Sequence, residues 1–430
     1  MTTAALAANK QAPVVVKFPR PFAGQREIQR FLLAGGKGAV VFAGRRYGKT
    51  QIGIYAIYSC AMQQVGLYWW VGLSWRSASM KRAWRLLKFY TRRLYKALGG
   101  MPDKVIREND KEITLPNGSV IWLRTAESPD SLAGESVSGV VMDEFTLMSA
   151  EVWPEFVEGT LADKQGWALF IGIPKGRNWA FHLWNSAHGR KNWRAFRFTT
   201  YDNPSTLIHE WLDETRLHTP EFFFRQEYLA EVMDDSGTVF RAISGAMTAP
   251  LTATRQTDHR YVAGVDWGKD NDYTVIMVMD AVTRQMVDFA RFNRLDWTTQ
   301  RGRIVEMVRK WGVDLTVAER NSIGDPIIEE LAKELRVLTD FAQPPRLQGF
   351  QTTHDTKGQI IEALALAIEQ QTIGLQAVDV LRGELEAYTM ERLPSGTYRY
   401  NAPSGMHDDC VIAAALMWYA ATQRRGVLVG

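Results

Sequence analysis

The stretch AGRRYGKTQ, residues 43–51, decides how the first half of this chain folds. Its Gly-Lys-Thr at 48–50 matches the end of the phosphate-loop pattern G-x-x-x-x-G-K-[ST], in which backbone N–H groups surround phosphates and the lysine reaches the terminal one. Ala43 replaces the first glycine, and the backbone donors survive this change if the position does not need a positive φ. The apolar run 38–42 predicts a strand before the loop, and the segment 51–64 predicts a helix after it. The alternative interpretation is a tight turn that carries these letters by coincidence.

An acidic pair follows a second apolar run. The segment SGVVMDEF, residues 138–145, predicts a buried strand that ends at Asp143 and Glu144. A nucleotide hydrolase needs one acid to hold Mg²⁺ and another to activate the attacking water, both at the end of a strand near the phosphate loop. We therefore expect Asp143 to hold Mg²⁺ and Glu144 to activate the water. A hydrophobic run before Asp-Glu is common, so the evidence lies in finding both motifs in this order.

Strand and helix patterns alternate through the first half of the chain. Residues 66–73 and 166–174 predict further strands, and 79–98 predict a helix. The segment 112–125 predicts two strands joined at Asn117-Gly118, a tight hairpin signal. This alternation predicts an α/β fold with a mostly parallel sheet covered by helices on both faces.

The predicted helix at 79–98 carries a concentrated positive charge. Between Ser74 and Pro102 there are eight basic residues and no acidic one, although the net charge of the chain is only +4. Five of these cations recur on one helix face: Lys81, Arg85, Lys88, Arg92 and Lys96. Such a stripe is suited to contacts with nucleic-acid phosphates. A solvated face, or a contact with a neighbouring subunit, is the open alternative.

The strand and helix pattern is interrupted at residues 232–260, which mix small, polar and turn residues. We therefore predict one domain over 1–235, a linker over 236–258 and a second domain over 259–430. The second domain begins with three strands that we expect to be antiparallel, followed by α/β units. Its sheet is therefore predicted to be mixed.

Carboxylates stand at the ends of predicted elements in the second domain. Asp266 ends the strand in AGVDWG, Glu319 ends the strand in DLTVAER, and Asp408 and Asp409 begin an apolar helix. Two-metal hydrolysis of phosphodiesters needs several carboxylates that converge from separate elements. The alternative is that each acid only ends or caps its element. Additional candidates near this set are Asp272, which could be an exposed turn acid, Lys357, which could contact phosphate, and His407, which could be an outer ligand or purely structural.

Both motifs in this order, with an arginine inside the loop, resemble the ATPase domain of the large terminase subunit of tailed bacteriophages. The resemblance extends along nearly the whole chain, because the order of acids in the second domain resembles the ribonuclease H-like nuclease domain of that family. It implies a P-loop ATPase domain followed by a nuclease domain. Ile173 in GIPKG stands where the family usually has Thr or Ser, which leaves no hydroxyl to sense the γ-phosphate there.

The resemblance also implies roles for individual residues. Arg45 would contact the γ-phosphate from within its own loop, while Arg46 could point instead to solvent or DNA, and Arg124 is a speculative arginine in trans. The residues implied at the nucleotide are Gln25, Gly44, Arg46, Gly48, Lys49, Thr50, Gln51 and Asp143. Thr50 and Asp143 would hold the Mg²⁺ of ATP. Two Mg²⁺ or Mn²⁺ ions would be held by Asp266, Glu319, Asp408 and Asp409, and which of the two adjacent aspartates is the inner ligand stays open.

The implied function is ATP-driven packaging of double-stranded DNA into a procapsid, with endonuclease cuts in concatemeric DNA at the start and end of packaging. The implied partners are the viral DNA, the portal protein, the small terminase subunit and further copies of the chain in a ring, expected to be a pentamer. Cys60 and Cys410 have no disulfide or metal-ligand spacing, and we find no membrane-spanning run, so we expect a soluble protein of the host cytoplasm.

Two other functions compete with this one. A helicase-like repair ATPase with a fused nuclease would need further helicase motifs and a second motor lobe, and the sequence predicts one lobe. A binding module would use the nucleotide site as a structural switch and the carboxylates as helix caps. Under that hypothesis the chain would not turn over ATP.

Overall fold

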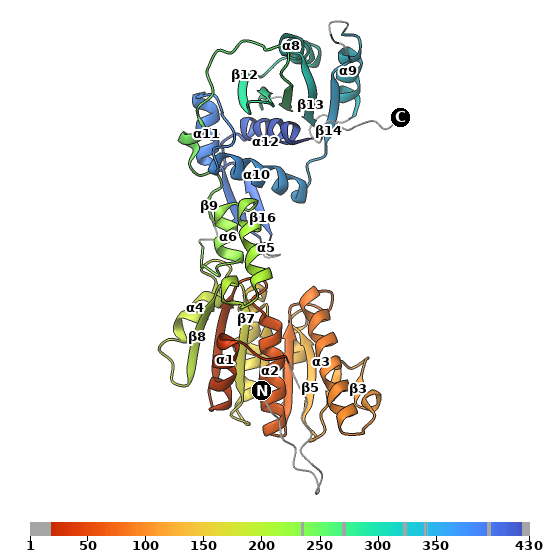
Figure 1. Cartoon of the computed structure of the whole chain (residues 1–430), viewed down its shortest axis with the longest axis vertical. Helices are drawn as coiled ribbons and strands as arrows, with labels where there is room; N and C mark the ends of the chain where they lie inside the picture. Colours follow the sequence, from red (N-terminus) through yellow and green to blue (C-terminus); the bar gives the residue numbers. More distant parts are fainter. Residues whose placement is uncertain are drawn as a thin grey trace. The chain divides into compact units, whose positions relative to one another are not determined.

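The computed structural model describes residues 19–233, 236–268, 272–320, 325–338, 341, 343–393 and 397–423. The chain divides into two compact units, Met1–Asp234 and Asp235–Gly430, and both are α/β (Figure 1). The segment 236–258, expected to be a linker, instead belongs to the second unit. Its strand β9 (Ser236–Thr238) pairs with β15 (Thr389–Arg392) of the second unit, and the backbone hydrogen bonds of this pairing hold the segment there.

The first unit is built on an eight-stranded sheet in the order β3-β4-β5-β2-β6-β7-β1-β8. All pairs from β5 to β8 are parallel, whereas β3–β4 and β4–β5 are antiparallel, so the sheet is mostly parallel as predicted. The predicted hairpin at Asn117-Gly118 joins β4 to β5. The strands are β1 (Gly38–Ala43), β2 (Leu67–Gly72), β3 (Ile106–Arg107), β4 (Glu112–Thr114), β5 (Val120–Thr125), β6 (Gly139–Asp143), β7 (Trp167–Gly172) and β8 (Trp193–Phe198).

Helices cover this sheet on both faces, since successive residues of its buried strands point to opposite sides. Figure 1 shows α1 (Ala23–Leu33), α2 (Lys49–Gln63) and α3 (Ala78–Ala97) over one face, where they pack with Val41. Val40 packs on the other face with α4 (Trp179–Ser186). The unit is completed by α5 (Thr206–Leu217), α6 (Glu221–Glu227) and short helical segments at Pro102–Lys104, Pro129–Leu132, Phe145–Leu147, Val152–Val157, Glu158–Leu161 and Thr200–Asp202.

The second unit contains a mixed five-stranded sheet in the order β12-β11-β10-β13-β14. The first three strands along the chain are antiparallel, and the next two add in parallel, as predicted. They are β10 (Tyr261–Asp266), β11 (Thr274–Asp280), β12 (Gln285–Phe292), β13 (Val313–Glu319) and β14 (Arg346–Phe350). A smaller sheet joins β9, β15 and β16 (Tyr398–Asn401). The helices are α7 (Ile243–Ala246), α8 (Trp297–Trp311), α9 (Asp325–Arg336), α10 (His354–Glu369), α11 (Asp379–Ala387) and α12 (Asp409–Thr422).

A glycine lets α12 approach the centre of this sheet. A Cβ at Gly264 of β10 would clash with the carbonyl oxygen of Ala413 and with the backbone nitrogen of Met417. Any larger residue would therefore push α12 away from β10. The close packing brings the first residue of α12, Asp409, to the same end of the sheet as Asp266.

Two further findings concern the environment of the chain. Cys60 and Cys410 are buried free thiols. Within the described residues, no helix combines the length and apolar character needed to cross a bilayer.

Candidate nucleotide and metal sites

The loop at 44–48 joins β1 to α2, as predicted from the sequence. Ala43 is the last residue of β1, so the position of the missing glycine is ordinary strand. Gly48 is the N-cap residue of α2 and has a φ of 104°, a left-handed conformation that favours glycine. Thr50 and Gln51 lie in the first turn of α2, where Gln51 Nε2 donates to the Tyr90 hydroxyl of α3 at 3.3 Å.

Lys49 folds back over the loop. Its Nζ donates to the carbonyl oxygens of Ala43 at 2.8 Å and Gly44 at 3.0 Å. Burial lowers the pKa of Lys49 to about 8, against the opposing attraction of Asp143. The hydrogen-bond acceptors of this ammonium are two neutral carbonyl groups, so a bound phosphate would compensate its charge better.

Asp143 ends β6, which is separated from β1 by β7. Burial and the neighbouring Glu144 raise the pKa of Asp143 to about 7. Its Oδ2 is buried and has no hydrogen-bond partner among the described residues. An orphaned carboxylate oxygen fits a bound divalent cation. Glu144 follows in a left-handed conformation with φ of 58°, and its backbone N–H donates to Ile171 at 2.8 Å.

Gln25, the candidate contact to the base, is already hydrogen-bonded within the first unit. Its side chain is buried, its Nε2 donates to the carbonyl oxygen of Gly48 at 3.4 Å, and its Oε1 accepts from the backbone of Phe22 at 3.3 Å. The amide thus joins α1 to the phosphate loop. A contact with a base would require these bonds to break.

Arg45 contacts a carboxylate that the sequence did not predict. Its Nε donates to Glu227 Oε2 at 2.6 Å, and Lys175 Nζ donates to the other oxygen of Glu227. Burial would raise the pKa of Glu227, but Lys175 and Arg45 lower it to about 2. The backbone N–H of Arg45 also donates to the Glu227 carbonyl at 2.8 Å. The loop is therefore fastened to the end of α6.

The two other candidate arginines of this unit lie against aromatic rings. The guanidinium of Arg46 lies 6.0 Å from the ring of Trp211 in α5, and that of Arg124 lies 3.3 Å from the ring of Trp122 on β5. Asn203 donates to the Arg46 carbonyl at 2.8 Å. Arg46 is thus directed toward α5, and its role at the nucleotide or at DNA stays a prediction.

Five carboxylates line one cavity of about 260 Å³ in the second unit. Asp266 and Glu319 end β10 and β13, which are parallel neighbours, and α12 starts beside them. Burial, then Glu319 and Asp409, raise the pKa of Asp266 well above its usual range. The carboxylates are Asp266, Asp272, Glu319, Asp408 and Asp409. Because this much negative charge converges, the cavity fits divalent cations.

The two adjacent aspartates have different surroundings. Lys357 Nζ donates to Asp408 Oδ2 at 3.1 Å. Asp409 is more buried, and burial raises its pKa to about 6, opposed by the N–H of Tyr273, which donates to its Oδ2 at 3.2 Å. Each of Asp272, His407 and Asp409 offers a ligand atom within 4.8 Å of the others, so these three residues also fit a cation.

A buried carboxylate from another helix supports this set, and sequence analysis missed it. Glu384 of α11 accepts from the backbone N–H of Cys410 at 2.8 Å and from Arg291 at 3.4 Å. The N-cap residue Asp408 makes no side-chain capping bond, so Glu384 satisfies the start of α12 instead. No local sequence pattern could have revealed these two contacts, because Cys410 and Arg291 lie 26 and 93 residues from Glu384 along the chain.

Comparisons with known proteins match this arrangement. The family described as "Terminase large subunit, T4likevirus-type, N-terminal" matches residues 40–244. The large terminase subunit of Thermus virus P23-45 is 30% identical over an alignment of 320 residues that covers 69% of this chain. The chain belongs to the family of phage large terminase subunits. The aligned region spans 64% of the length of that Thermus virus relative.

Other members of the terminase family give weaker matches. The large subunit of Escherichia phage T5 is 33% identical over 140 residues, covering 31% of this chain and 32% of its own length. The solved structure of a large terminase from a thermophilic bacteriophage is 14% identical, with a TM-score of 0.50, and covers 94% of this chain and 99% of its own. The last comparison supports the fold alone.

Glu227→Gln should destabilise the first unit by about 2 kcal/mol at neutral pH, since it removes a partly buried negative charge from between two cations. The pKa of Glu227 is lowered on folding, so its contribution is present above about pH 4.5 and is lost as the pH falls toward about 2. Urea denaturation across this pH range should show the difference from wild type shrinking. Glu231→Gln, at a more exposed ion pair, should cost about 0.5 kcal/mol. An equal loss of unfolding free energy in both variants would contradict the prediction that the Glu227 ion pairs stabilise the unit more than an exposed pair does.

Glu384→Ala should destabilise the second unit by about 2 kcal/mol, because it leaves the Cys410 N–H and Arg291 without their acceptor. Glu384→Gln retains an acceptor oxygen and should cost less. Denaturant unfolding followed by near-UV circular dichroism would measure both losses. Identical losses for the two variants would show that packing, rather than the hydrogen bond to α12, explains the effect.

Proposed function

We propose that this chain is the ATP-hydrolysing and DNA-cutting subunit of a DNA-packaging motor. The observation that carries the proposal is the presence of two separate sites in one chain. The first unit has a phosphate loop facing an orphaned buried carboxylate, and the second has a cavity lined by five carboxylates. Membership of the terminase family supports the combination.

In the first unit, ATP would bind across the loop. Lys49 would exchange its two carbonyl acceptors for the β- and γ-phosphates, and Thr50 and Asp143 would hold Mg²⁺, which neutralises developing charge. Glu144 would orient and deprotonate the attacking water. Arg45 would stabilise the γ-phosphate in the transition state by exchanging the Glu227 carboxylate for phosphate oxygens, since both are anionic acceptors.

In the second unit, the scissile phosphate would bind over the acidic cavity. Asp266, Glu319, Asp408 and Asp409 would hold two Mg²⁺ or Mn²⁺ ions, which activate water and stabilise the leaving oxygen. Asp272 and His407 would add outer contacts on the Asp409 side. Lys357 would hold Asp408 in place and neutralise part of its charge.

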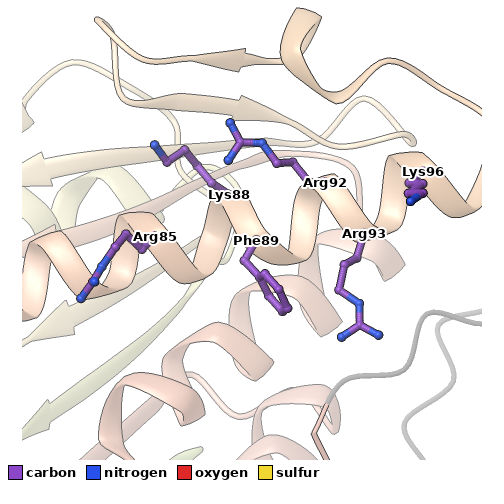
Figure 2. A pocket seen from close by; sticks show the side chains of 6 residues that line it. All are labelled: Arg85, Lys88, Phe89, Arg92, Arg93 and Lys96. Carbon is purple, nitrogen blue, oxygen red and sulfur yellow. The ribbon is translucent and has the colours of Figure 1, made fainter.

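Double-stranded DNA would be held on α3 of the first unit. Figure 2 shows Lys88 and Arg92 on one side of the helix and Phe89 and Arg93 on the other. Lys88 is paired with Glu108 and Arg92 with Asp103, the latter at 3.6 Å, so part of the positive stripe is already neutralised. The side chains drawn in Figure 2 line a shallow surface cavity of about 490 Å³, and Arg85, Arg93 and Lys96 are exposed along it. Contacts with phosphates alone suit a motor that moves along any sequence.

The wider assembly proposed for this chain is the one that the family resemblance implies. ATP hydrolysis would drive viral DNA into a procapsid, and the nuclease would cut concatemers at initiation and termination. The chain would act in the host cytoplasm as a ring, of five copies, docked on the portal protein, with the small terminase subunit as a regulator. In such a ring Arg124 is the candidate arginine in trans.

A paired assay of Glu144→Gln and Asp266→Asn tests the separation of sites. Glu144→Gln should lower ATP hydrolysis by at least about 100-fold and spare Mn²⁺-dependent plasmid cutting, since it removes only the base that activates water. Asp266→Asn should do the reverse, because it removes a metal ligand. Loss of both activities from either change, with folding intact, would refute two independent sites.

Neutralising the exposed cations of α3 tests the DNA surface. Arg85→Gln with Lys96→Gln, two exposed members of the stripe, should weaken binding of random-sequence duplex and reduce the slope of log K against log salt by about 2. Fluorescence anisotropy over a salt series measures both quantities. Arg190→Gln, an exposed cation elsewhere in the first unit, is the matched control. An unchanged slope would show that the stripe is a solvated face.

A further inference from the structure

A second cavity adjoins the acidic one in the second unit. It has a volume of about 310 Å³ and lies between the start of α10 and the strand β16. Thr352 and Lys357 line both cavities, so the two share a wall. A polymer bound at the acidic cavity would therefore also reach the second cavity.

The charge changes sign between the two cavities. The described residues that line the second cavity include Lys357, Arg399 and His354, and no carboxylate. Thr353 caps α10 by accepting from the N–H of Thr356 at 3.2 Å, so the positive end of a 16-residue helix also faces this region. An anion would be stabilised here, whereas a cation would be stabilised in the acidic cavity.

The β16 wall of the cavity is anchored. The hydroxyl of Tyr400 donates to Glu362 of α10 at 2.6 Å, and Tyr400 is buried. The anchor fixes Tyr398 and Arg399 beside α10, with Tyr398 half-buried and Arg399 exposed. Glu391 lies opposite Arg399 in the β15–β16 register.

We propose that this cavity, the β16 cavity, binds the sugar-phosphate backbone of the DNA strand next to the phosphate being cut. Arg399 contacts a phosphate, and Tyr398 provides an aromatic surface for a sugar or base. Neither residue takes part in the chemical step, because the carboxylates proposed to bind metal line the other cavity, across the wall that contains Lys357. This inference rests on the proposed DNA cleavage by the second unit.

The test is the dependence of plasmid cutting on DNA concentration, in Mn²⁺, with the full chain. Arg399→Gln and Tyr398→Ala should each raise KM about threefold to tenfold and leave kcat unchanged, since each removes binding to flanking backbone. Arg399→Lys keeps the charge and should restore most of the affinity. Arg303→Gln, an exposed cation of α8 that lies against Phe292, should change neither constant.

Two results would overturn the inference while leaving the proposed function intact. One is an unchanged KM for Arg399→Gln in an enzyme that cuts, and the other is a fall in kcat with KM unchanged. If the wild type does not cut DNA at all, the proposed nuclease function fails. Binding of a labelled duplex to Asp266→Asn, with and without Arg399→Gln, would then still decide the β16 cavity, and equal affinities would reject it.

Discussion

Hydrogen bonds between parallel strands bring together the reactive groups of both units. In the first unit β7 joins β1 to β6, so the loop after residue 43 and the acid at 143 reach one edge of the sheet. In the second unit β10 and β13 are parallel neighbours, so Asp266 and Glu319 meet although 53 residues separate them in the numbering. The two sites share this arrangement, because the carboxyl ends of neighbouring parallel strands lie at one edge of a sheet.

Buried charge is balanced differently in the two units. In the first, cations are balanced by carboxylates: the charge of Asp143 attracts Lys49, and Glu227 is held between Arg45 and Lys175. In the second, five carboxylates line the cavity with Lys357 and His407 as the basic groups. The first site is therefore suited to an anionic nucleotide together with a cation, and the second requires cations before an anionic DNA strand could approach.

The second site also depends on close backbone packing. Gly264 lets α12 lie directly on β10, and Glu384 satisfies the N-terminus of that helix from α11. The side chain of Asp408 therefore does not cap the helix, and Asp408 and Asp409 both line the cavity. A helix whose first turn presents carboxylates to a cavity needs such support, because its own N–H groups would otherwise compete for the same carboxylates.

The sequence by itself determined the α/β class, the mixed second sheet, the strand–loop–helix at 38–63 and the acids at strand ends, because these follow from local periodicity and from residues adjacent in the chain. Only the tertiary structure decided that 236–258 joins the second unit, that Gln25 is buried, and that Glu227 and Glu384 complete the two sites. Arg45 and its partner are 182 residues apart, and Arg291 and its partner are 93 apart. Such pairs leave no periodic trace, since their distance is set by how helices pack on a sheet rather than by spacing along the chain.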